Sequence, residues 1–345
     1  MFLELLIVFI ATFIGTGALN IIFRFLGKRG YMGNLYEPVR GGTPRGIGIV
    51  PFIVISLFLP AGYNNLVLVM GLCALVDDVI GRRRIANLPI EIGQLARGIG
   101  MLCVIGLGYP LMGISSILVA LMIQPMNIAD MQPGSAVSVV VVMSFFTILA
   151  TLILGVAPVA QIPAYYVPLL TLVTCIAYAP LDYSGKIMLG EVGNHTFAIA
   201  LGISFYILGG FLGTLILFIV TTALIAYIRR RNLSRFLINK LHISNPTFGD
   251  LFMDVLTGGG LGDLFRKIIL GERQQVVTDN LLISLGFRRL LYNPYSPNLE
   301  RVIEKDVRTK PTDLRKCLFC DGYHVGKNRD NKTDYDKIVN ETKTD

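Results

Sequence analysis

Two adjacent carboxylates, Asp77 and Asp78, close an apolar run and are followed within six residues by three arginines. An ionisable group at membrane depth costs on the order of 2–3 kcal/mol, so such groups usually serve a function. Other polar residues stand at the ends of apolar runs in the same way: Arg45, Asn127, Asp130, Lys186, Glu191 and His195. Their repeated placement predicts one shared site.

The residue types favour chemistry on a phosphorylated substrate. Carboxylates are hard oxygen ligands for Mg²⁺, which usually takes one or two of them and leaves the rest of its shell to phosphate and water. On a helix, Asp77 and Asp78 point about 100° apart, because one turn takes about 3.6 residues. We therefore expect the two to have different roles. A site at the membrane surface would let a water-soluble donor meet an acceptor anchored in lipid.

The composition excludes an ordinary soluble domain. Of 345 residues, 53% are hydrophobic and only 16% are charged, and the mean hydropathy is +0.62. Residues 1–228 hold 10 Lys/Arg and 8 Asp/Glu, whereas residues 229–345 hold 21 and 15. This contrast predicts an all-α, polytopic membrane helix bundle over 1–228, followed by a polar tail.

Nine membrane spans are expected, since a spanning helix needs roughly 20 apolar residues and somewhat fewer within a bundle. The first is interpreted as a retained helix and not a signal peptide, because its N-terminus is acidic. Segment 229–320 is predicted to be partly helical and interfacial, with an amphipathic stretch near 248–270, and 321–345 to be disordered. The spans lie near 3–26, 46–60, 65–80, 95–109, 111–127, 137–157, 164–181, 194–209 and 211–228.

The connections between spans alternate in charge. The charged set comprises 27–46, 77–98, 127–136, 181–194 and 229–232, and the connections between them are uncharged. The positive-inside rule places the charged set in the cytoplasm. The N-terminus is then outside, and the predicted site and the tail are cytoplasmic, in a multi-pass protein of the plasma membrane. Sequons at Asn331 and Asn340 would then escape glycosylation.

Four segments together resemble the polyprenyl-phosphate N-acetylhexosamine-1-phosphate transferase superfamily. "GGTPRGIGI" resembles its T-P-x-x-G-G segment, and "DDVIGRRR" resembles D-D-x-x-G. "MNIADMQPGSA" is similar to its N-x-x-D element, and "GKIMLGEVGNHTFAIALG" to K-x-F-M-G-D-x-G-S. Their order, spacing and alternation with spans agree with the family across residues 1–228.

The resemblance implies transfer of a sugar phosphate, GlcNAc-1-phosphate by default, from a UDP-N-acetylhexosamine to polyprenyl or dolichyl phosphate, with release of UMP. It implies Mg²⁺ as the cofactor, with Mn²⁺ as an alternative. The roles implied are catalysis for Asp77 and Asp78, metal binding for Glu191, Asp78 and Asp130, and substrate binding for Arg45, Asn127, Asp130, Lys186 and His195.

Three departures keep other interpretations open. Glu191 replaces the family's Asp, and Asn194 and His195 stand where Gly-Ser is usual. A late His-rich motif is missing, because only the isolated His242 and His324 follow the last span. A catalytically inactive member that acts as a membrane scaffold is the main alternative. A transporter is disfavoured by the uncharged outer connections.

Simpler interpretations also exist for single residues. Asn127 and Asp130 could simply form a turn. Lys186 could be an ordinary lysine whose charged end reaches the membrane surface, and His195 could form only a local hydrogen bond. Cys317 and Cys320, with His324, could contribute to a zinc site, although free thiols are the favoured interpretation. The basic tail favours a membrane surface over nucleic acid, and the sequence is compatible with a homodimer.

Overall fold

The computed structural model describes residues 1–81, 83, 91–158, 162–241, 243, 245–258, 260–271, 275, 277 and 279–293. All of them belong to one unit of the chain, Met1–Ile303. The second unit, Glu304–Asp345, falls outside the described residues, and so do the cysteines and the histidine of the predicted zinc site and both sequons.

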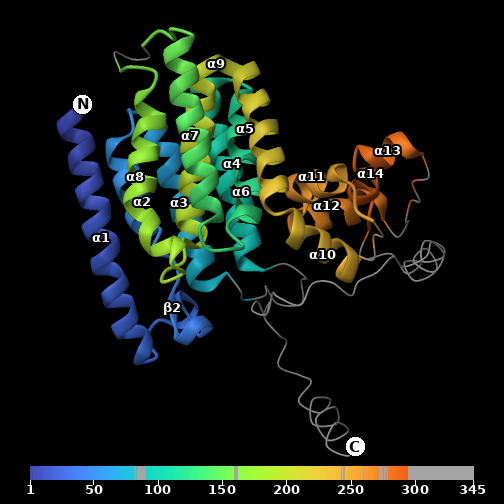
Figure 1. Cartoon of the computed structure of the whole chain (residues 1–345), viewed down its shortest axis with the longest axis horizontal. Helices are drawn as coiled ribbons and strands as arrows, with labels where there is room; N and C mark the ends of the chain where they lie inside the picture. Colours follow the sequence, from blue (N-terminus) through green and yellow to red (C-terminus); the bar gives the residue numbers. More distant parts are fainter. Residues whose placement is uncertain are drawn as a thin grey trace, which may run out of the picture. The chain divides into compact units, whose positions relative to one another are not determined.

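The apolar runs fold as helices, because backbone groups in lipid must form their hydrogen bonds within the segment. Within the described residues, six helices are long and apolar enough to cross a membrane. The prediction of an all-α membrane bundle is confirmed in this coarse form (Figure 1). The six are α1 (Phe2–Lys28), α3 (Tyr63–Ile80), α4 (Ile92–Met112), α7 (Ser135–Ile153), α8 (Tyr166–Tyr183) and α9 (Gly190–Ile228).

The count of nine spans differs from these six where apolar runs form short or broken helices. The predicted span 46–60 corresponds to the ten-residue helix α2 (Ile49–Phe58). At 1.5 Å per residue α2 is about 15 Å long, half the thickness of a bilayer core. The predicted span 111–127 corresponds to α5 (Ser115–Leu121) and α6 (Ile123–Ala129). The number of spans therefore stays a prediction.

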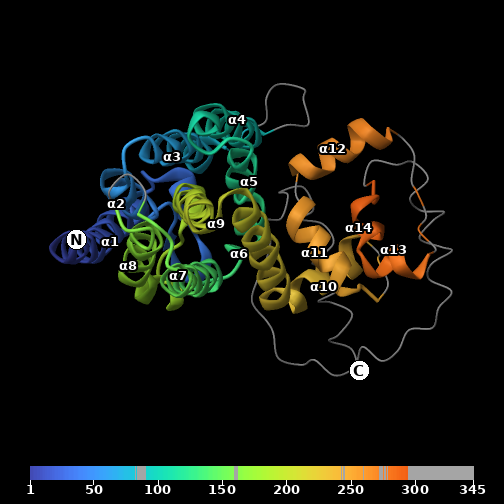
Figure 2. The ribbon, with the colours of Figure 1, turned by 90° about the horizontal axis from the view of Figure 1, so that it is seen from above.

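The predicted eighth and ninth spans form one element, α9, which is interrupted in the middle. Gly209 has φ −155° and ψ 27°, and Gly210 has φ 57° and ψ −143°, so neither is helical. The two halves appear as separate helices in the view along the bundle, and the first half lies in the middle of the other helices (Figure 2). That half is buried on nearly all sides, as is typical of a helix that is apolar all round.

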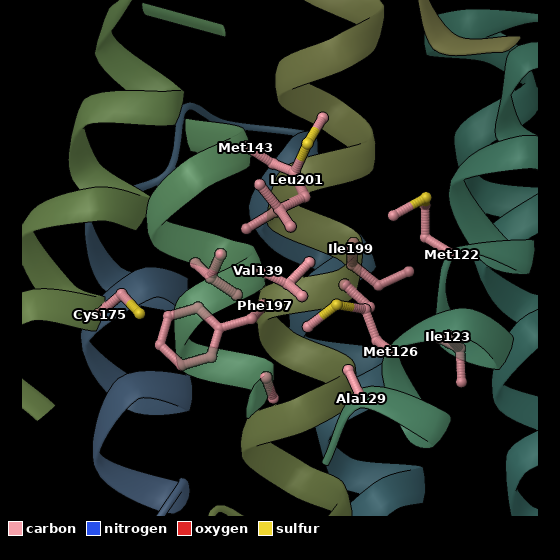
Figure 3. Packing of buried hydrophobic residues seen from close by; sticks show 14 of the residues in the cluster. Met122, Ile123, Met126, Ala129, Val139, Met143, Cys175, Phe197, Ile199 and Leu201 are labelled. Atoms are coloured by element: carbon pink, nitrogen blue, oxygen red, sulfur yellow. The ribbon is translucent and has the colours of Figure 1, made fainter. Parts of the chain in front are cut away.

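The first half of α9 lies at the centre of the hydrophobic core. Phe197, Ile199 and Leu201 on this helix are fully buried. Figure 3 shows them among apolar side chains that come from the neighbouring helices. These neighbours include Met122, Met126 and Ala129 near α6, Val139 and Met143 on α7, and Cys175 on α8. The core thus fixes the position of the helix whose first turn carries Glu191.

A short antiparallel pair of strands connects α1 to α2. The strands are β1 (Tyr36–Glu37) and β2 (Thr43–Pro44). Arg45 follows β2 directly, and its backbone N–H donates to the carbonyl of Leu35 at 2.8 Å. The pairing therefore fixes the backbone from which the Arg45 side chain extends. The 3-10 helices Gly33–Leu35 and Val39–Gly41 flank β1.

Five further helices follow α9 in the described part of the chain. The side chain of Thr247 and that of Asp250 form a capping box at the start of one of them. Asp250 pairs with Arg288, and Asp254 pairs with Arg289, so buried ion pairs link two of the five. The helices are α10 (Arg230–Leu241), α11 (Phe248–Thr257), α12 (Gly260–Leu270), α13 (Asn280–Ser284) and α14 (Phe287–Leu290).

Candidate functional site

Polar side chains from segments far apart in the sequence meet where α3 ends and α9 begins. The segment after β2, the last turn of α3, the first turns of α4 and α9, and the end of α6 each contribute. Ion pairs and hydrogen bonds connect these side chains. We call the following residues the charged cluster: Arg45, Asp77, Asp78, Arg97, Asn127, Glu191 and His195.

Asp78 is buried and binds the N-terminus of α9. Its Oδ1 accepts the backbone N–H of Glu191 at 3.0 Å, and its Oδ2 accepts that of Val192 at 3.0 Å. Arg45 Nε lies 3.2 Å from Oδ1. The first N–H groups of a helix have no partner within it, and the helix dipole favours a negative charge there. Asp78 is therefore a cap for α9 that comes from a different helix.

Glycines make this close approach possible. Gly190 has φ 71°, and a Cβ there would lie 2.7 Å from Asp78 Oδ2. A Cβ on Gly48, just before α2, would lie 2.3 Å from the Cα of Gly193. The backbones of α2 and α9 are thus in direct contact at these two glycines. Any larger residue would separate α9 from the segment that carries Arg45.

Arg97 on α4 joins two carboxylates of the charged cluster. Its Nη2 lies 3.0 Å from Asp77 Oδ2 and 3.2 Å from Glu191 Oε2. Sequence reasoning did not single out this residue. The available indication was a lone arginine inside the predicted span 95–109, which the cost of burying a charge in a membrane makes unusual.

Glu191 lies at the centre of the ion pairs. Its Oε1 is 3.5 Å from Arg45 Nη2, and its Oε2 is 3.2 Å from Arg97 Nη2. His195 Nε2 lies 3.2 Å from the same Oε2, because residues four apart share a helix face. His195 is fully buried. It thus forms the local hydrogen bond that one interpretation of the sequence expected, and it does so inside the cluster.

Asn127 at the end of α6 connects the amide of Asn194 to the charged residues of the cluster. Its amide lies 2.6 Å from that of Asn194 and 3.2 Å from His195 Nε2. The orientation of an amide is assigned from its surroundings. With Asn127 Nδ2 facing Glu191 Oε2 at 2.9 Å, its Oδ1 faces Arg97 Nη1 at 2.6 Å. This orientation satisfies both charged neighbours.

Asp130 lies next to the charged cluster without joining its ion pairs. Among the described residues, no hydrogen bond or ion pair of its carboxylate is found. Burial raises the pKa of Asp130 well above its usual range, and the nearby carboxylates of Asp182 and Glu191 raise this pKa further. Asp182 itself accepts the backbone N–H of Gly134 at 2.9 Å. The charge of Arg45 lowers the pKa of Asp130 only in part, so Asp130 is an acid with a raised pKa and no ion-pair partner among the described residues.

Lys186 is the predicted site residue that stands apart. Its side chain is exposed and forms no ion pair with any residue the structure describes. Its carbonyl oxygen, however, accepts a hydrogen bond from Arg24 Nη2 on α1 at 2.6 Å. Arg24 Nη1 also donates to the carbonyl of Gly42 at 3.0 Å. Arg24 therefore ties together the segments before α2 and before α9.

The cluster holds Arg45 in its charged form. Burial alone would lower the pKa of this guanidinium, but Asp78, Glu191 and Glu37 raise the pKa above its ordinary value. The three carboxylates of the charged cluster, Asp77, Asp78 and Glu191, nevertheless outnumber its two arginines. The site therefore has an excess of negative charge, which favours a cation.

The predicted metal ligands do not form a three-ligand centre. Across the described residues, no three His, Cys, Asp or Glu side chains are arranged to hold a metal ion. Asp78 is occupied by backbone N–H groups and Arg45, and Glu191 by Arg45, Arg97 and His195. Within the described part of the chain, Asp130 remains as an oxygen donor without an ion-pair partner. A Mg²⁺ ion bound here would take this one protein carboxylate and would fill the rest of its shell with phosphate and water.

Comparison with known proteins adds no assignment, since neither the protein-family models nor the curated proteins that were searched match this chain. The resemblance to the transferase superfamily consequently depends on the four motifs. His242, the first histidine after the last predicted span, lies outside the described residues.

Proposed function

We propose that the chain transfers N-acetylhexosamine-1-phosphate, by default GlcNAc-1-phosphate, from a UDP-sugar to polyprenyl or dolichyl phosphate. The product begins a lipid-linked glycan, and UMP is released. One observation carries the proposal: residues of the four motifs, which are far apart in the sequence, contact one another in the charged cluster. A chance likeness in four separate segments would give no reason for them to meet.

In the proposed reaction a phosphate oxygen of the lipid acceptor attacks the sugar-bearing phosphorus of the donor. A new P–O bond forms as the bond to the bridging oxygen breaks, and UMP leaves with that oxygen. Arg45 and Arg97 bind the diphosphate by exchanging some of their carboxylate partners for phosphate oxygens, because the planar guanidinium group suits both. Stabilisation of the spreading charge supplies most of the acceleration.

The two adjacent aspartates have different roles in this proposal. Asp78 is a positioning residue, since its two oxygens hold the first turn of α9 and orient Arg45. Asp77 is partly exposed, and in the described structure its carboxylate pairs with Arg97. It therefore keeps the catalytic role at the lipid phosphate that the resemblance implies. Asp130 would hold Mg²⁺ together with the donor phosphates, and Mn²⁺ is the alternative ion. The ion supplies neutralisation of the diphosphate charge.

The proposal includes an orientation in the plasma membrane. The short helix α2, the pair α5 and α6, and each half of α9 would complete nine spans. The N-terminus would lie outside, and the charged cluster and the C-terminal segment would face the cytoplasm, where UDP-sugars are made. Support comes from the charge alternation of the connections, which places the basic segments on one side.

The proposal is tested by assaying the purified full-length protein in detergent with UDP-GlcNAc, undecaprenyl or dolichyl phosphate, and Mg²⁺. We expect UMP release only when donor and acceptor are both present, together with a lipid product that carries a diphosphate sugar. A chelator should stop the reaction, and added Mg²⁺ should restore it. UMP release without the acceptor would indicate hydrolysis and contradict the transferase proposal. Other UDP-sugars in the same assay identify the donor.

A second candidate function, a catalytically inactive scaffold, is favoured by the ion pairs themselves. Arginines already compensate Asp77, Asp78 and Glu191, so the cluster has a structural role that needs no substrate. In that case no UDP-sugar would yield UMP at any Mg²⁺ concentration. Binding of UDP-sugars, measured by thermal stabilisation of the protein, would then be absent as well.

A further inference from the structure

Helix α12 exposes its apolar side chains and buries its arginine. Phe265, Ile268 and Ile269 are 67%, 71% and 71% exposed, whereas Arg266 is only 6% exposed. Arg266 Nη1 donates to Thr257 Oγ1 of α11 at 3.0 Å. In water a surface helix is arranged the other way round, with its apolar stripe facing the core. This inversion requires an apolar environment for the exposed face.

The three exposed residues form one continuous face. Positions 265, 268 and 269 are separated by three and four residues, so their side chains lie together on a helix. Lys267 is exposed and points roughly to the opposite side, since each residue turns the helix by about 100°. The apolar face and the basic side chain therefore have the arrangement of a helix that lies in a membrane interface.

We propose that α12 lies in the plane of the bilayer interface, with Phe265, Ile268 and Ile269 inserted among the lipid chains. The occupant of this face is thus the membrane itself. The inference does not depend on the proposed enzymatic function.

The connection to the membrane-spanning part of the chain favours lipid as the occupant. Helix α10, which is twelve residues long, follows directly after α9. At the junction the guanidinium of Arg230 lies 4.9 Å from the ring centre of Tyr227. Tyrosine and arginine at the end of a span are typical of the headgroup region. The segment that contains α12 therefore begins at a membrane surface.

Charge on the same segment suits anionic headgroups. Arg230, Arg231, Arg235 and Lys240 are exposed on α10, and no acidic residue occurs in that helix. Basic residues close to a bilayer are attracted to anionic lipids. A helix with an apolar face on the same segment is then held near lipid in which it can insert. A water-soluble partner protein would need neither this charge nor this proximity.

The test uses the full-length chain in lipid nanodiscs, with the five native cysteines replaced. A polarity-sensitive fluorophore is attached to Ile268→Cys, and to Lys267→Cys as the matched neighbour. At position 268 we expect a blue-shifted emission that lipid-borne nitroxide quenches several-fold more than aqueous iodide does. At position 267 iodide should be the stronger quencher. Equal quenching by iodide at both positions would overturn the proposal.

Protection of position 268 from both quenchers would also overturn it, because a protein surface would then cover the face. A second measurement avoids substitutions altogether. The unmodified chain in discs is irradiated with a lipid that carries a photoactivatable group in its acyl chain, and peptides are mapped by mass spectrometry. Labelling within 265–269 is expected. Labelled spans together with an unlabelled 265–269 would contradict the inference.

Discussion

At the scale of single residues, Asp78 shows how a carboxylate can serve a site without touching its substrate. Both of its oxygens accept backbone N–H groups of α9, and Oδ1 also faces Arg45. The same carboxylate thus fixes the direction of Glu191 and the position of a guanidinium group. Loss of its charge should affect both the fold and the proposed activity.

We expect Asp78→Asn to reduce activity by at least tenfold and to lower the free energy of unfolding by about 1–3 kcal/mol, because an amide nitrogen would face a backbone N–H donor. The measurements are UMP release and thermal unfolding in detergent. Glu4→Gln is the matched control, since Glu4 is exposed on α1 and pairs only with the N-terminal amine in the described structure. Full stability and full activity in Asp78→Asn would contradict this role.

Arg97 offers a sharper test, because its function depends on the shape of the side chain. One guanidinium reaches both Asp77 and Glu191 and also faces Asn127. A lysine ammonium is a point charge that cannot reproduce this fork. We expect Arg97→Lys to lower kcat by at least tenfold while the protein remains folded. Arg29→Lys, at an exposed arginine over Phe25, should have no effect. Unchanged kcat and KM in Arg97→Lys would exclude it from the site.

Sequence reasoning at this scale identified residues whose type was unusual for their place. It brought Arg45, Asp78 and Glu191 into one predicted site, and their side chains do meet. It could not identify Arg97, because a single cation inside an apolar run does not reveal which carboxylates it will face. Nor could it predict that Lys186 lies apart from the charged cluster, since the side chain of an exposed lysine is not constrained by its place in a motif.

At the scale of elements, the contact between α2 and α9 positions the charged cluster. Gly48 and Gly193 let the two backbones touch, and the N–H of Gly48 donates to the carbonyl of Leu189 at 3.1 Å. The cap that Asp78 forms on α9 depends on this approach. The glycines lie within the motif segments, but their pairing follows from tertiary contact and could not be predicted from spacing.

We expect Gly48→Ala to destabilise the protein by about 1–3 kcal/mol, because the added Cβ would overlap the backbone of Gly193. Gly17→Ala is the control: Gly17 lies within α1, and no heavy atom would lie within 4 Å of its added Cβ. Alanine there should be neutral or stabilising, since it favours the helix by roughly 0.5–1 kcal/mol. Thermal unfolding in one detergent compares both. A neutral Gly48→Ala would show that the contact is looser than described.

The lengths of elements were harder to predict than their existence. Apolar composition located α1, α3 and α7 well, since each is one uninterrupted run. The same criterion could not reveal that α2 ends after ten residues or that α5 and α6 are separate, because composition does not fix where backbone hydrogen bonding is interrupted. The break at Gly209 and Gly210 was predicted correctly, because a Gly-Gly pair inside an apolar run favours an interruption of the helix.

At the scale of the whole molecule, the number of spans decides on which side the two ends of the chain lie. With an odd number, such as nine, the N-terminus and the C-terminal segment lie on opposite sides of the membrane. With only the six long helices as spans they would lie on the same side. The short helix α2, the pair α5 and α6, and the break in α9 decide between these cases, so parity is a sensitive test of how the short elements are placed.

Glycosylation in microsomes can read this parity, because acceptor sequons are modified only in the lumen, which corresponds to the outside. The natural sequons at Asn331 and Asn340 report on the C-terminal segment, and a sequon in a short tag before Met1 reports on the N-terminus. We expect the tag to be modified and the two natural sequons to remain unmodified, as judged by the mobility shift that an endoglycosidase reverses. A control that joins the same tag to a secreted protein shows that the tag can be modified. Modification at both ends, or at neither, would indicate an even number of spans. Modification of the C-terminal sequons alone would place the charged cluster outside, away from cytoplasmic UDP-sugars.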